Sequence, residues 1–165
     1  MFKINDYIMY GLTGVCKVMD ITTETISSNI KKEYYVLHPV YGEDTIIKTP
    51  IDNKKISMRK IISKDDVISI INSMPTSETL WFEDEKIRNQ EFKYILKSGK
   101  CEDLVKLIRS IYDNKIHMKS MGRKPRQSDD DIMKIAERLL NEEFATILNL
   151  QPNDSPSYIS NNINI

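Results

Sequence analysis

The sequence predicts an α+β fold in which a small antiparallel β domain precedes a helical domain. Residues 1–61 are rich in Ile, Val, Thr and Tyr and show patches of apolar and polar alternation, as half-buried strands do. After residue 63 the apolar residues instead recur with the spacing of amphipathic helices. A chain of 165 residues that is 40% hydrophobic can bury one medium core or two small ones.

The β-rich segment divides into short strands separated by turn residues. We expect strands at residues 7–10, 15–23, 33–38, 45–49 and 57–61. Strands this short, joined by tight connections, cannot bury two sheet faces separately. Closure into a small Tudor-like or SH3-like antiparallel barrel is the economical solution, because a closed sheet exposes no edge. This β domain is expected to span residues 1–63.

A short connector helix is expected over residues 64–74. Ser63 is placed to cap its first turn, and Asp65 and Asp66 bring negative charge to the positive end of the helix dipole. Pro75 then disfavours helix at the residue before it and ends the segment.

The helical domain is expected over residues 75–150. Its first helix should begin between Ser77 and Trp81 and run to about Lys97, with Gly99 as the stop. We expect one face of this helix to hold Ile87, Tyr94, Ile95 and either Trp81 or Glu91.

Two further helices complete the predicted domain. Residues 102–114 carry the stripe of a buried helix face, formed by Leu104, Leu107, Ile108, Ile111 and Tyr112. Ser128 is expected to cap the last helix, which runs to Leu148, with acidic residues 129–131 in its first turn. Residues 151–165 have little periodicity, and we expect this tail to be disordered.

Composition excludes several classes of protein. Lys plus Arg and Asp plus Glu both number 24, so no global basic field draws the chain onto nucleic acid. No apolar run approaches the roughly 20 residues of a membrane span, and no signal-peptide core opens the chain, so we expect a cytoplasmic protein without membrane association. Cys16 and Cys101 lack metal-binding spacing and are expected to be buried apolar residues.

Catalytic constellations are not apparent in the sequence. There is no recognisable Ser, His and acid set, no phosphate-binding glycine loop and no cluster of metal ligands. His38 and His117 have no neighbouring partner in the sequence that indicates catalysis. We therefore expect a protein that is not an enzyme and needs no cofactor.

A basic run is a first candidate for nucleic-acid contact. Its cations, with no acidic residue among them, are Lys115, Lys119, Arg123, Lys124 and Arg126. Gly122 and Pro125 interrupt the chain here, so these side chains can project from a loop between two helices. The run is either a solvated interhelical loop or a set of contacts to backbone phosphates.

Trp81, the only tryptophan, is the second candidate. An aromatic ring held exposed on a rigid support can enter a base step in the minor groove and stabilise unstacked DNA. The same ring could equally be an anchor of the helical core. The polar context of residues 78–85 does not separate these two interpretations.

Several stretches recur in the order and spacing of a known family. They are Phe2-Lys3-Ile4-Asn5-Asp6-Tyr7-Ile8-Met9-Tyr10, Gly14-Val15, Tyr34-Tyr35-Val36-Leu37, Ile47-Lys48-Thr49-Pro50-Ile51-Asp52-Asn53 and Met58-Arg59. Together with Trp81 and the helical second half, they resemble the CarD family of bacterial transcription regulators, also called CdnL, over roughly residues 1–148. The N-terminal part is also similar to the polymerase-interacting domain of the transcription-repair coupling factor.

The resemblance implies a Tudor-like N-terminal domain that docks on the β-subunit lobe of RNA polymerase. The positions that it implies for this contact are Tyr10, Glu24, Lys48 and Pro50. It also implies a helical domain placed beside promoter DNA at the upstream edge of the bubble. There Trp81 would wedge into the minor groove and slow collapse of the open complex, while Lys86 and Arg88 would meet phosphates. We expect weak, sequence-nonspecific DNA contact by a monomer.

This chain departs from the family pattern at three places. Gly11 follows Tyr10 where the family usually has proline, and Glu24 stands where a basic polymerase-contacting residue is often found, although Lys48 keeps a cation at the second such position. Acidic residues 83–85 follow Trp81 where relatives commonly have basic ones. Acids near phosphate weaken DNA affinity, so tethering by the polymerase would then be obligatory.

Two functional hypotheses follow. In the first, the chain is a polymerase-bound regulator of the promoter complex, with Trp81 and the cations named above facing DNA. In the second, it is a protein-protein interaction adaptor of RNA polymerase or another complex, and its helical half never contacts DNA.

Overall fold

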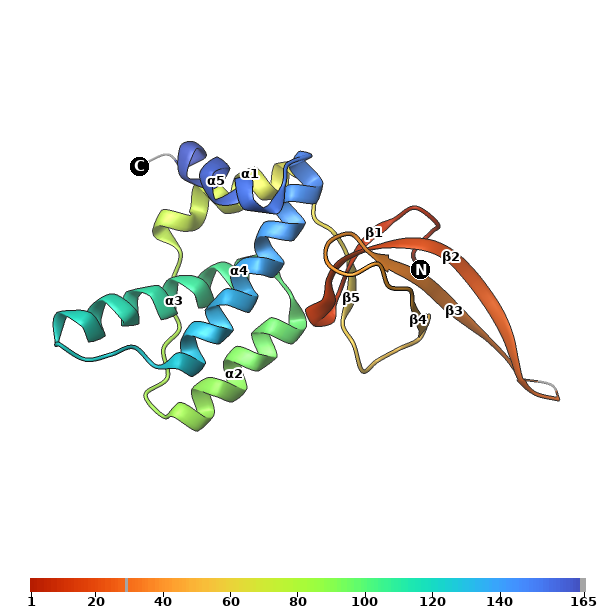
Figure 1. Ribbon diagram of the computed structural model, residues 1–165, viewed down its shortest axis with the longest axis horizontal. Coiled ribbons are helices and arrows are strands. Elements are labelled where there is room, and N and C mark those ends of the chain that lie inside the picture. The colour runs from red at the N-terminus through yellow and green to blue at the C-terminus, as the bar shows by residue number, and fades with distance from the viewer. Residues whose placement is uncertain (29, 164–165) are drawn as a thin grey trace. The chain divides into compact units, whose positions relative to one another are not determined.

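The computed structural model describes residues 1–28 and 30–163 and divides the chain into two compact units, Met1–Ile61 and Ile62–Ile165. The first unit is built from strands and the second from helices (Figure 1). This organisation confirms the predicted α+β class. The division falls close to the boundary predicted at residue 63.

The N-terminal unit, over its described residues, forms a five-stranded antiparallel sheet with the order β4-β3-β2-β1-β5. Its strands are β1 (Tyr7–Tyr10), β2 (Gly14–Ser27), β3 (Ile30–Pro39), β4 (Ile47–Pro50) and β5 (Met58–Lys60), with the short 3-10 helix η1 (Gly11–Thr13) between β1 and β2. Among the described residues no pairing joins β4 to β5, so the sheet is open. The predicted closed barrel is not confirmed.

The β2–β3 hairpin is longer than predicted, because pairing continues from Cys16 opposite Pro39 to Ser27 opposite Ile30. A shift in register between Val18 and Asp20 marks a bulge in β2. One face of the sheet carries the apolar core, made of Ile8, Tyr10, Cys16, Val18, Tyr35 and Leu37. Because successive side chains of a strand alternate between faces, Tyr34, next to the buried Tyr35, belongs to the opposite face.

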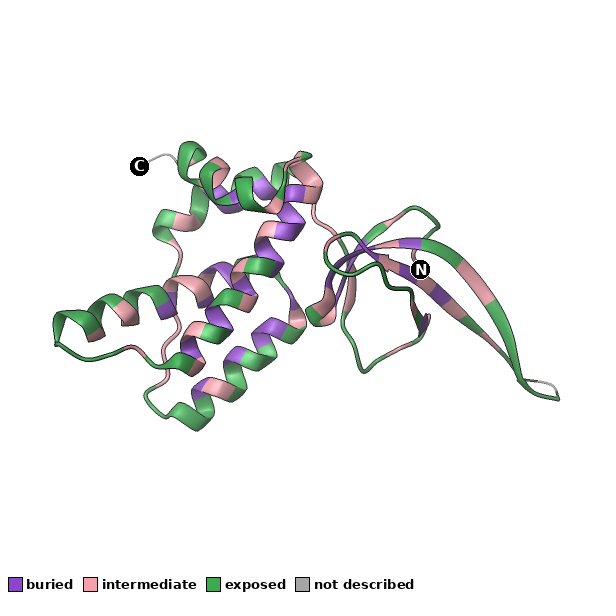
Figure 2. Cartoon of the chain, in the orientation of Figure 1, coloured by how far each residue is buried: buried purple, intermediate pink, exposed green. Residues whose placement is uncertain are grey.

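The C-terminal unit consists of helices over its described residues. They are α1 (Lys64–Ser73), η2 (Met74–Thr76), α2 (Glu85–Ser98), α3 (Cys101–Ser120), α4 (Gln127–Leu148), η3 (Pro152–Asp154) and α5 (Ser155–Asn162). Buried positions alternate with exposed ones along α2, α3 and α4, as expected for helices that pack on one side (Figure 2).

Helix α1 belongs to the helical core and is not a free connector, which corrects the expectation for residues 64–74. Its Val67 and Ile71 are buried in one cluster with Cys101 of α3 and Phe144 of α4. Its predicted cap is confirmed. Ser63 accepts a hydrogen bond from the backbone N–H of Asp66, and the Asp66 side chain accepts one from the backbone N–H of Ser63.

The predicted start and face of α2 were wrong. Residues 77–84 are not helical, and the helix begins at Glu85 after Asp84, whose carboxylate accepts a hydrogen bond from the backbone of Ile87. Of the residues predicted to share a face, Ile87 is 49% exposed and Tyr94 is 71% exposed. The face that packs inward instead carries Arg88, Phe92, Ile95 and Leu96. Gly99 ends the helix as predicted, with a φ of 64°.

The expected cap of α4 is also corrected. The helix begins at Gln127, and Arg126 occupies the cap position without a side-chain hydrogen bond. Ser128 is therefore inside the first turn. Asp129, interpreted from the sequence as a capping acid, is only 4% exposed and faces the buried side chain of Arg88.

The expected disorder of residues 151–165 is overturned over residues 151–163, which form η3 and α5. Proline stands in the first turn of both elements, where its missing N–H costs no hydrogen bond. Tyr158, Ile159 and Ile163 pack against the core cluster of α1, α3 and α4. Apolar side chains spaced along this segment therefore hold it in place, and residues 164 and 165 lie outside the described residues.

Candidate functional site

The face of the sheet opposite its core brings together three residues that the family resemblance implies for polymerase binding. Lys48 of β4 forms an ion pair with Glu24 of β2, and its Nζ lies 5.3 Å from the centroid of the Tyr34 ring. Tyr34 of β3 stands directly opposite Pro50 of β4. The negative charge of Glu24 is thus compensated within the sheet by Lys48, which is itself half exposed.

A second charge pair lies on the same face. Lys32 is opposite Glu24 in the β2–β3 register, and its Nζ is 3.8 Å from Asp52 Oδ1. The surface that results has alternating charges around one aromatic ring, with no single sign dominating. Sequence analysis did not assign Lys32 or Asp52 to it, although their positions in the alternation of β3 and in the turn after β4 indicate this face.

Tyr10, by contrast, is 6% exposed and packs in the core of the sheet with Tyr35 and Leu37. This burial corrects the expectation that its side chain contacts a partner. The backbone conformation at the next position explains why the chain has glycine there and not proline. Gly11 has a φ of 47°, which proline cannot adopt, and its N–H donates a hydrogen bond of 2.9 Å to the carbonyl of Ser57.

Trp81 lies in the irregular segment before α2 and is half-buried. Its ring meets the edge of the Phe92 ring with centroids 6.2 Å apart, and the guanidinium carbon of Arg88 lies 4.5 Å from its centroid. The interpretation of Trp81 as a core anchor is supported in part, and its contact with DNA stays a prediction. The indole is anchored to the helical core, and part of its surface remains open to solvent.

Arg88 is 2% exposed, so it has almost no surface with which to contact a phosphate. Its Nε and Nη2 each lie 3.3 Å from a carboxylate oxygen of Asp129, and Nη1 donates a 2.8 Å hydrogen bond to the carbonyl of Phe82. This placement corrects the expectation of a DNA contact. Its position four residues before Phe92 on the buried face of α2 is the feature of the sequence that indicates an inward side chain.

The segment that carries Trp81 is held at both ends. The N–H of Leu80 donates a 2.7 Å hydrogen bond to Ser110 Oγ on α3, and the carbonyl of Phe82 accepts from Arg88 on α2. Ser110 is buried and itself donates to the carbonyl of Lys106. Sequence analysis missed both Ser110 and Asp129, because their role depends on contacts across helices that no local pattern reveals.

The acidic residues after Trp81 have structural partners of their own. Asp84 caps α2, and Glu85 forms an ion pair with Arg126 at the start of α4. Part of the negative charge expected to repel phosphate, that of Glu85, is thus neutralised by a cation of the helical unit. Arg126 is correspondingly engaged as well, although it remains exposed.

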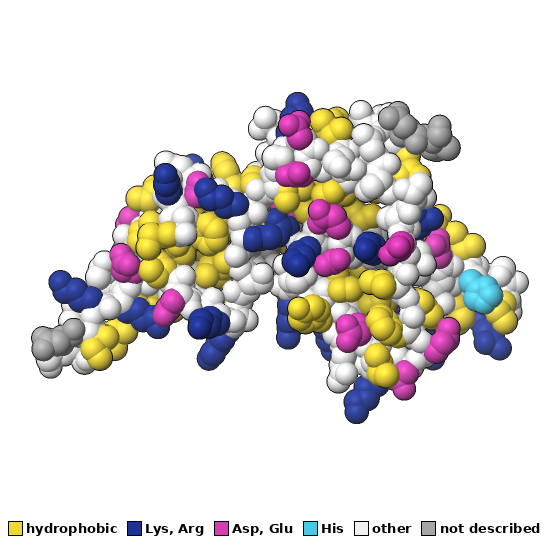
Figure 3. All heavy atoms as spheres, turned by 180° about the vertical axis from the view of Figure 1, so that it is seen from behind, with side chains coloured by type: hydrophobic (Ala, Val, Ile, Leu, Met, Phe, Trp, Pro, Cys, Tyr) yellow, Lys and Arg dark blue, Asp and Glu magenta, His cyan; other side chains and the backbone are white. Residues whose placement is uncertain are grey.

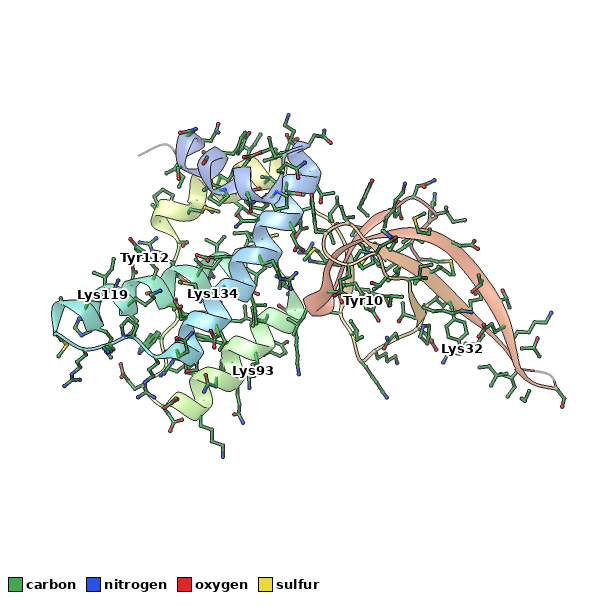
Figure 4. All side chains as sticks on the ribbon, viewed as in Figure 1. Tyr10, Lys32, Lys93, Tyr112, Lys119 and Lys134 are labelled. Atoms are coloured by element: carbon green, nitrogen blue, oxygen red, sulfur yellow. The ribbon has the colours of Figure 1, made fainter. Side chains whose placement is uncertain are left out.

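The remaining cations assigned to DNA are exposed. Lys119 lies in the last turn of α3 (Figure 4). Lys86 lies in the first turn of α2, and Arg123 and Lys124 lie in the segment that joins α3 to α4. Within residues 1–28 and 30–163 the structure shows no ion pair for these four side chains. On the face drawn in Figure 3, Lys, Arg, Asp and Glu side chains are interspersed without a broad basic field.

Asp130 draws the beginning of α4 toward α3. Its carboxylate forms ion pairs with Lys115 of α3 and, at 3.3 Å, with Lys134 of α4. Hydrogen bonds from Lys115 and Lys134 lower the pKa of Asp130 below its ordinary value. Lys115, the first cation of the basic run, is therefore part of an ion pair within the helical unit.

Within the described residues, no group of three or more His, Cys, Asp or Glu side chains is arranged to hold a metal ion. In the same part of the chain, every helix is too short or too polar to cross a lipid bilayer. Cys16 and Cys101 are both buried, as predicted, and Cys101 Sγ lies 3.0 Å from a carboxylate oxygen of the buried Glu143.

The sheet-forming unit coincides with a known domain family. Residues 2–62 match the family described as CarD-like/TRCF RID domain, which is an RNA polymerase-interacting type of domain. A search of curated proteins found no match to the chain. The matched range covers β1 to β5 and ends where the helical unit begins. Residues 2–62 thus form a CarD-like/TRCF RID domain.

Proposed function

We propose that this protein is a transcription regulator that binds the β subunit of RNA polymerase and stabilises the promoter open complex through its helical domain. The single observation that carries the proposal is the family match over residues 2–62. The regulator has no catalytic role in this proposal and acts by binding alone.

The outer face of the sheet supports the first half of the proposal. Glu24, Lys48 and Pro50 lie close together there, with the Tyr34 ring beneath the Lys48 ammonium. Charge pairs around an aromatic ring are suited to a partner surface that also carries both signs, because complementary charges set orientation and association rate. We assign the polymerase contact to this face and omit the buried Tyr10.

The partly open indole supports the second half. An aromatic side chain that stabilises unstacked DNA must be exposed on one side and fixed on the other. Trp81 meets both conditions, since Arg88 and Phe92 hold it while part of its surface remains accessible. Lys86, Lys119, Arg123, Lys124 and Arg126 are the cations proposed to meet phosphates.

DNA contact by this chain is proposed to depend on the polymerase. The protein has no net charge at neutral pH, so nonspecific attraction to DNA is weak. Binding to the polymerase raises the effective concentration of the helical domain at the promoter to the order of millimolar, and weak contacts then suffice.

The test measures binding of the full chain to RNA polymerase and to its isolated β subunit. Lys48→Glu places two acids side by side on the sheet and should weaken both interactions. Lys54→Glu, an equal change of charge in the exposed turn before β5, is the matched control and should have little effect. Equal binding by wild type and Lys48→Glu would remove this face from the proposal.

The adaptor hypothesis is the second candidate, and the even mixture of charges favours it. If the helical domain binds only protein, crosslinkers placed at Lys119 and Lys124 in a promoter complex will label polypeptide and not DNA. Labelling of promoter DNA next to the bubble would exclude a pure adaptor.

A further inference from the structure

The helical unit contains a groove of about 770 Å³ that the function proposed above does not use. It is bordered by the end of α1 with η2, by α3, by α4 and by α5. Its apolar lining includes Met74, Val105, Ile108, Leu140, Ile159 and Ile163. A groove of this size and lining is suited to covering the side chains of a binding partner.

One wall of the groove continues as an apolar ridge along α3. The ridge consists of Val105, Ile108, Tyr112 and Ile116, spaced so that they follow one side of the helix. Tyr112 is 56% exposed and Ile116 is 52% exposed. Tyr112 lies on the side of α3 that faces α1 and α5 (Figure 4). At about 1.5 Å per residue the ridge is roughly 16 Å long, which is the shape of a helix-binding site more than of a compact ligand pocket.

The groove also contains a carboxylate that forms no direct ion pair among the described residues. Glu137 of α4 lines it and makes no hydrogen bond or ion pair within the described part of the chain. The nearest cations, Lys115 and Lys134, are both paired with Asp130 instead. Burial raises the pKa of Glu137 above its ordinary value, and the nearby charge of Asp130 adds to this, while the charges of Lys115 and Lys134 act in the opposite direction.

The guanidinium of Arg109, which lines the groove, already has hydrogen-bond and ion-pair partners. Arg109 Nη1 donates hydrogen bonds to the carbonyls of Met74 and Pro75, at 3.0 and 2.8 Å, and its Nε lies 3.8 Å from Asp113. Among the described residues that line the groove, Glu137 is therefore a charge without a direct ion pair that an occupant would meet.

We propose that this groove docks an amphipathic helix of a partner protein, whose apolar face covers the α3 ridge and whose Lys or Arg side chain pairs with Glu137. Helices that bind in grooves place apolar residues at i, i+3, i+4 and i+7, which span about 10.5 Å and therefore fit within the length of the ridge. The cation gives the helix its orientation, because only one end of the apolar face can bring it to Glu137. This site is independent of polymerase and DNA binding.

Synthetic helical peptides and the full chain provide the test. Each peptide carries leucines at i, i+3, i+4 and i+7, and a single lysine is moved around the border of that apolar face from one peptide to the next. A peptide with glutamine in place of lysine is the reference. Fluorescence anisotropy should show at least one lysine position that binds about fivefold more tightly than the reference, equivalent to about 1 kcal/mol.

Matched variants locate the site. Glu137→Gln should abolish the lysine advantage, and Tyr112→Ala should weaken every peptide about tenfold through loss of aromatic contact. Tyr94→Ala removes a ring from α2 that is even more exposed than Tyr112 and lies outside the groove, and it should change nothing. Both tyrosines are exposed, so neither variant threatens folding.

Three results would overturn the proposal. These are a lack of binding by any peptide, a lysine advantage that survives Glu137→Gln, and equal losses in Tyr112→Ala and Tyr94→Ala. Self-association of the chain that Tyr112→Ala abolishes, without peptide binding, would assign the groove to a second copy instead and would likewise reject a helical partner.

Discussion

The guanidinium of Arg88 lies 4.5 Å from the centroid of the Trp81 ring and fixes the position of that ring within the helical unit. Arg88 can do so because Asp129 holds it from the other side, with two nitrogen–oxygen distances of 3.3 Å. A buried cation contacting an aromatic face stabilises by more than an exposed one, because water does not compete for it. The Trp81 indole is therefore held in a fixed position by Arg88 and Asp129.

Removal of the Asp129 carboxylate should destabilise the helical unit strongly. Asp129→Ala leaves the Arg88 guanidinium buried without its counterion, which costs about 3–5 kcal/mol. Urea unfolding followed by Trp81 fluorescence measures this loss, since no other tryptophan contributes to the emission. Lys134→Ala, which removes one exposed partner of Asp130, is the control and should cost under about 1 kcal/mol. A similar small loss in both variants would show that the Arg88 pair is not structurally important.

Ser110→Ala tests whether α3 positions the segment that carries Trp81. The variant removes the acceptor of the Leu80 N–H and should cost about 1 kcal/mol. It should also make the indole more mobile, which time-resolved anisotropy and acrylamide quenching of Trp81 will detect. Ser98→Ala, which removes a hydroxyl at the end of α2, is the comparison. Unchanged quenching in Ser110→Ala would mean that Arg88 alone fixes the ring.

The ion pairs of Asp130 predict a pH dependence with a definite sign. Because the pKa of Asp130 is lowered in the folded state, its contribution to stability is present above the ordinary pKa of aspartate and is lost as the pH falls through the folded value. Asp130→Asn should therefore be less stable than wild type at neutral pH. The two stability curves should converge in acid, as chemical denaturation at a series of pH values will show. A difference that stays constant down to low pH would exclude the charge pairs as its cause.

Much of the fold was predictable because local patterns determine it. The alternation of apolar and polar residues predicted the strands near their observed positions, and Ser63 with Asp66 predicted the cap of α1. The open sheet was not predictable, because closure depends on how β4 and β5 approach each other, and no local pattern reports that distance. The helical tail was missed since Tyr158 and Ile159 gain their stability only by packing on a distant cluster.

In the candidate site, too, some features could be predicted from local sequence and others depend on contacts between distant residues. Exposure of Arg123 and Lys124 followed from their position beside glycine and proline, which interrupt the helices there. Lys119 is exposed too, but on α3, which continues to Ser120 and not only to residue 114 as predicted. Arg88 was assigned to phosphate contact because the family resemblance implies DNA-facing cations near Trp81. Its burial requires Asp129, 41 residues later in the chain, and only the tertiary structure brings the two together.

The lifetime of the promoter open complex tests the central claim most directly. It should be measured after a competitor challenge, with wild type, Trp81→Ala and Phe82→Ala at saturating polymerase binding. Phe82 also meets the Phe92 ring edge-on, at 6.4 Å, so its variant controls for lost packing. The account predicts that Trp81→Ala binds polymerase normally yet shortens the lifetime, while Phe82→Ala preserves it. A folded Trp81→Ala variant that leaves the lifetime unchanged would contradict the account.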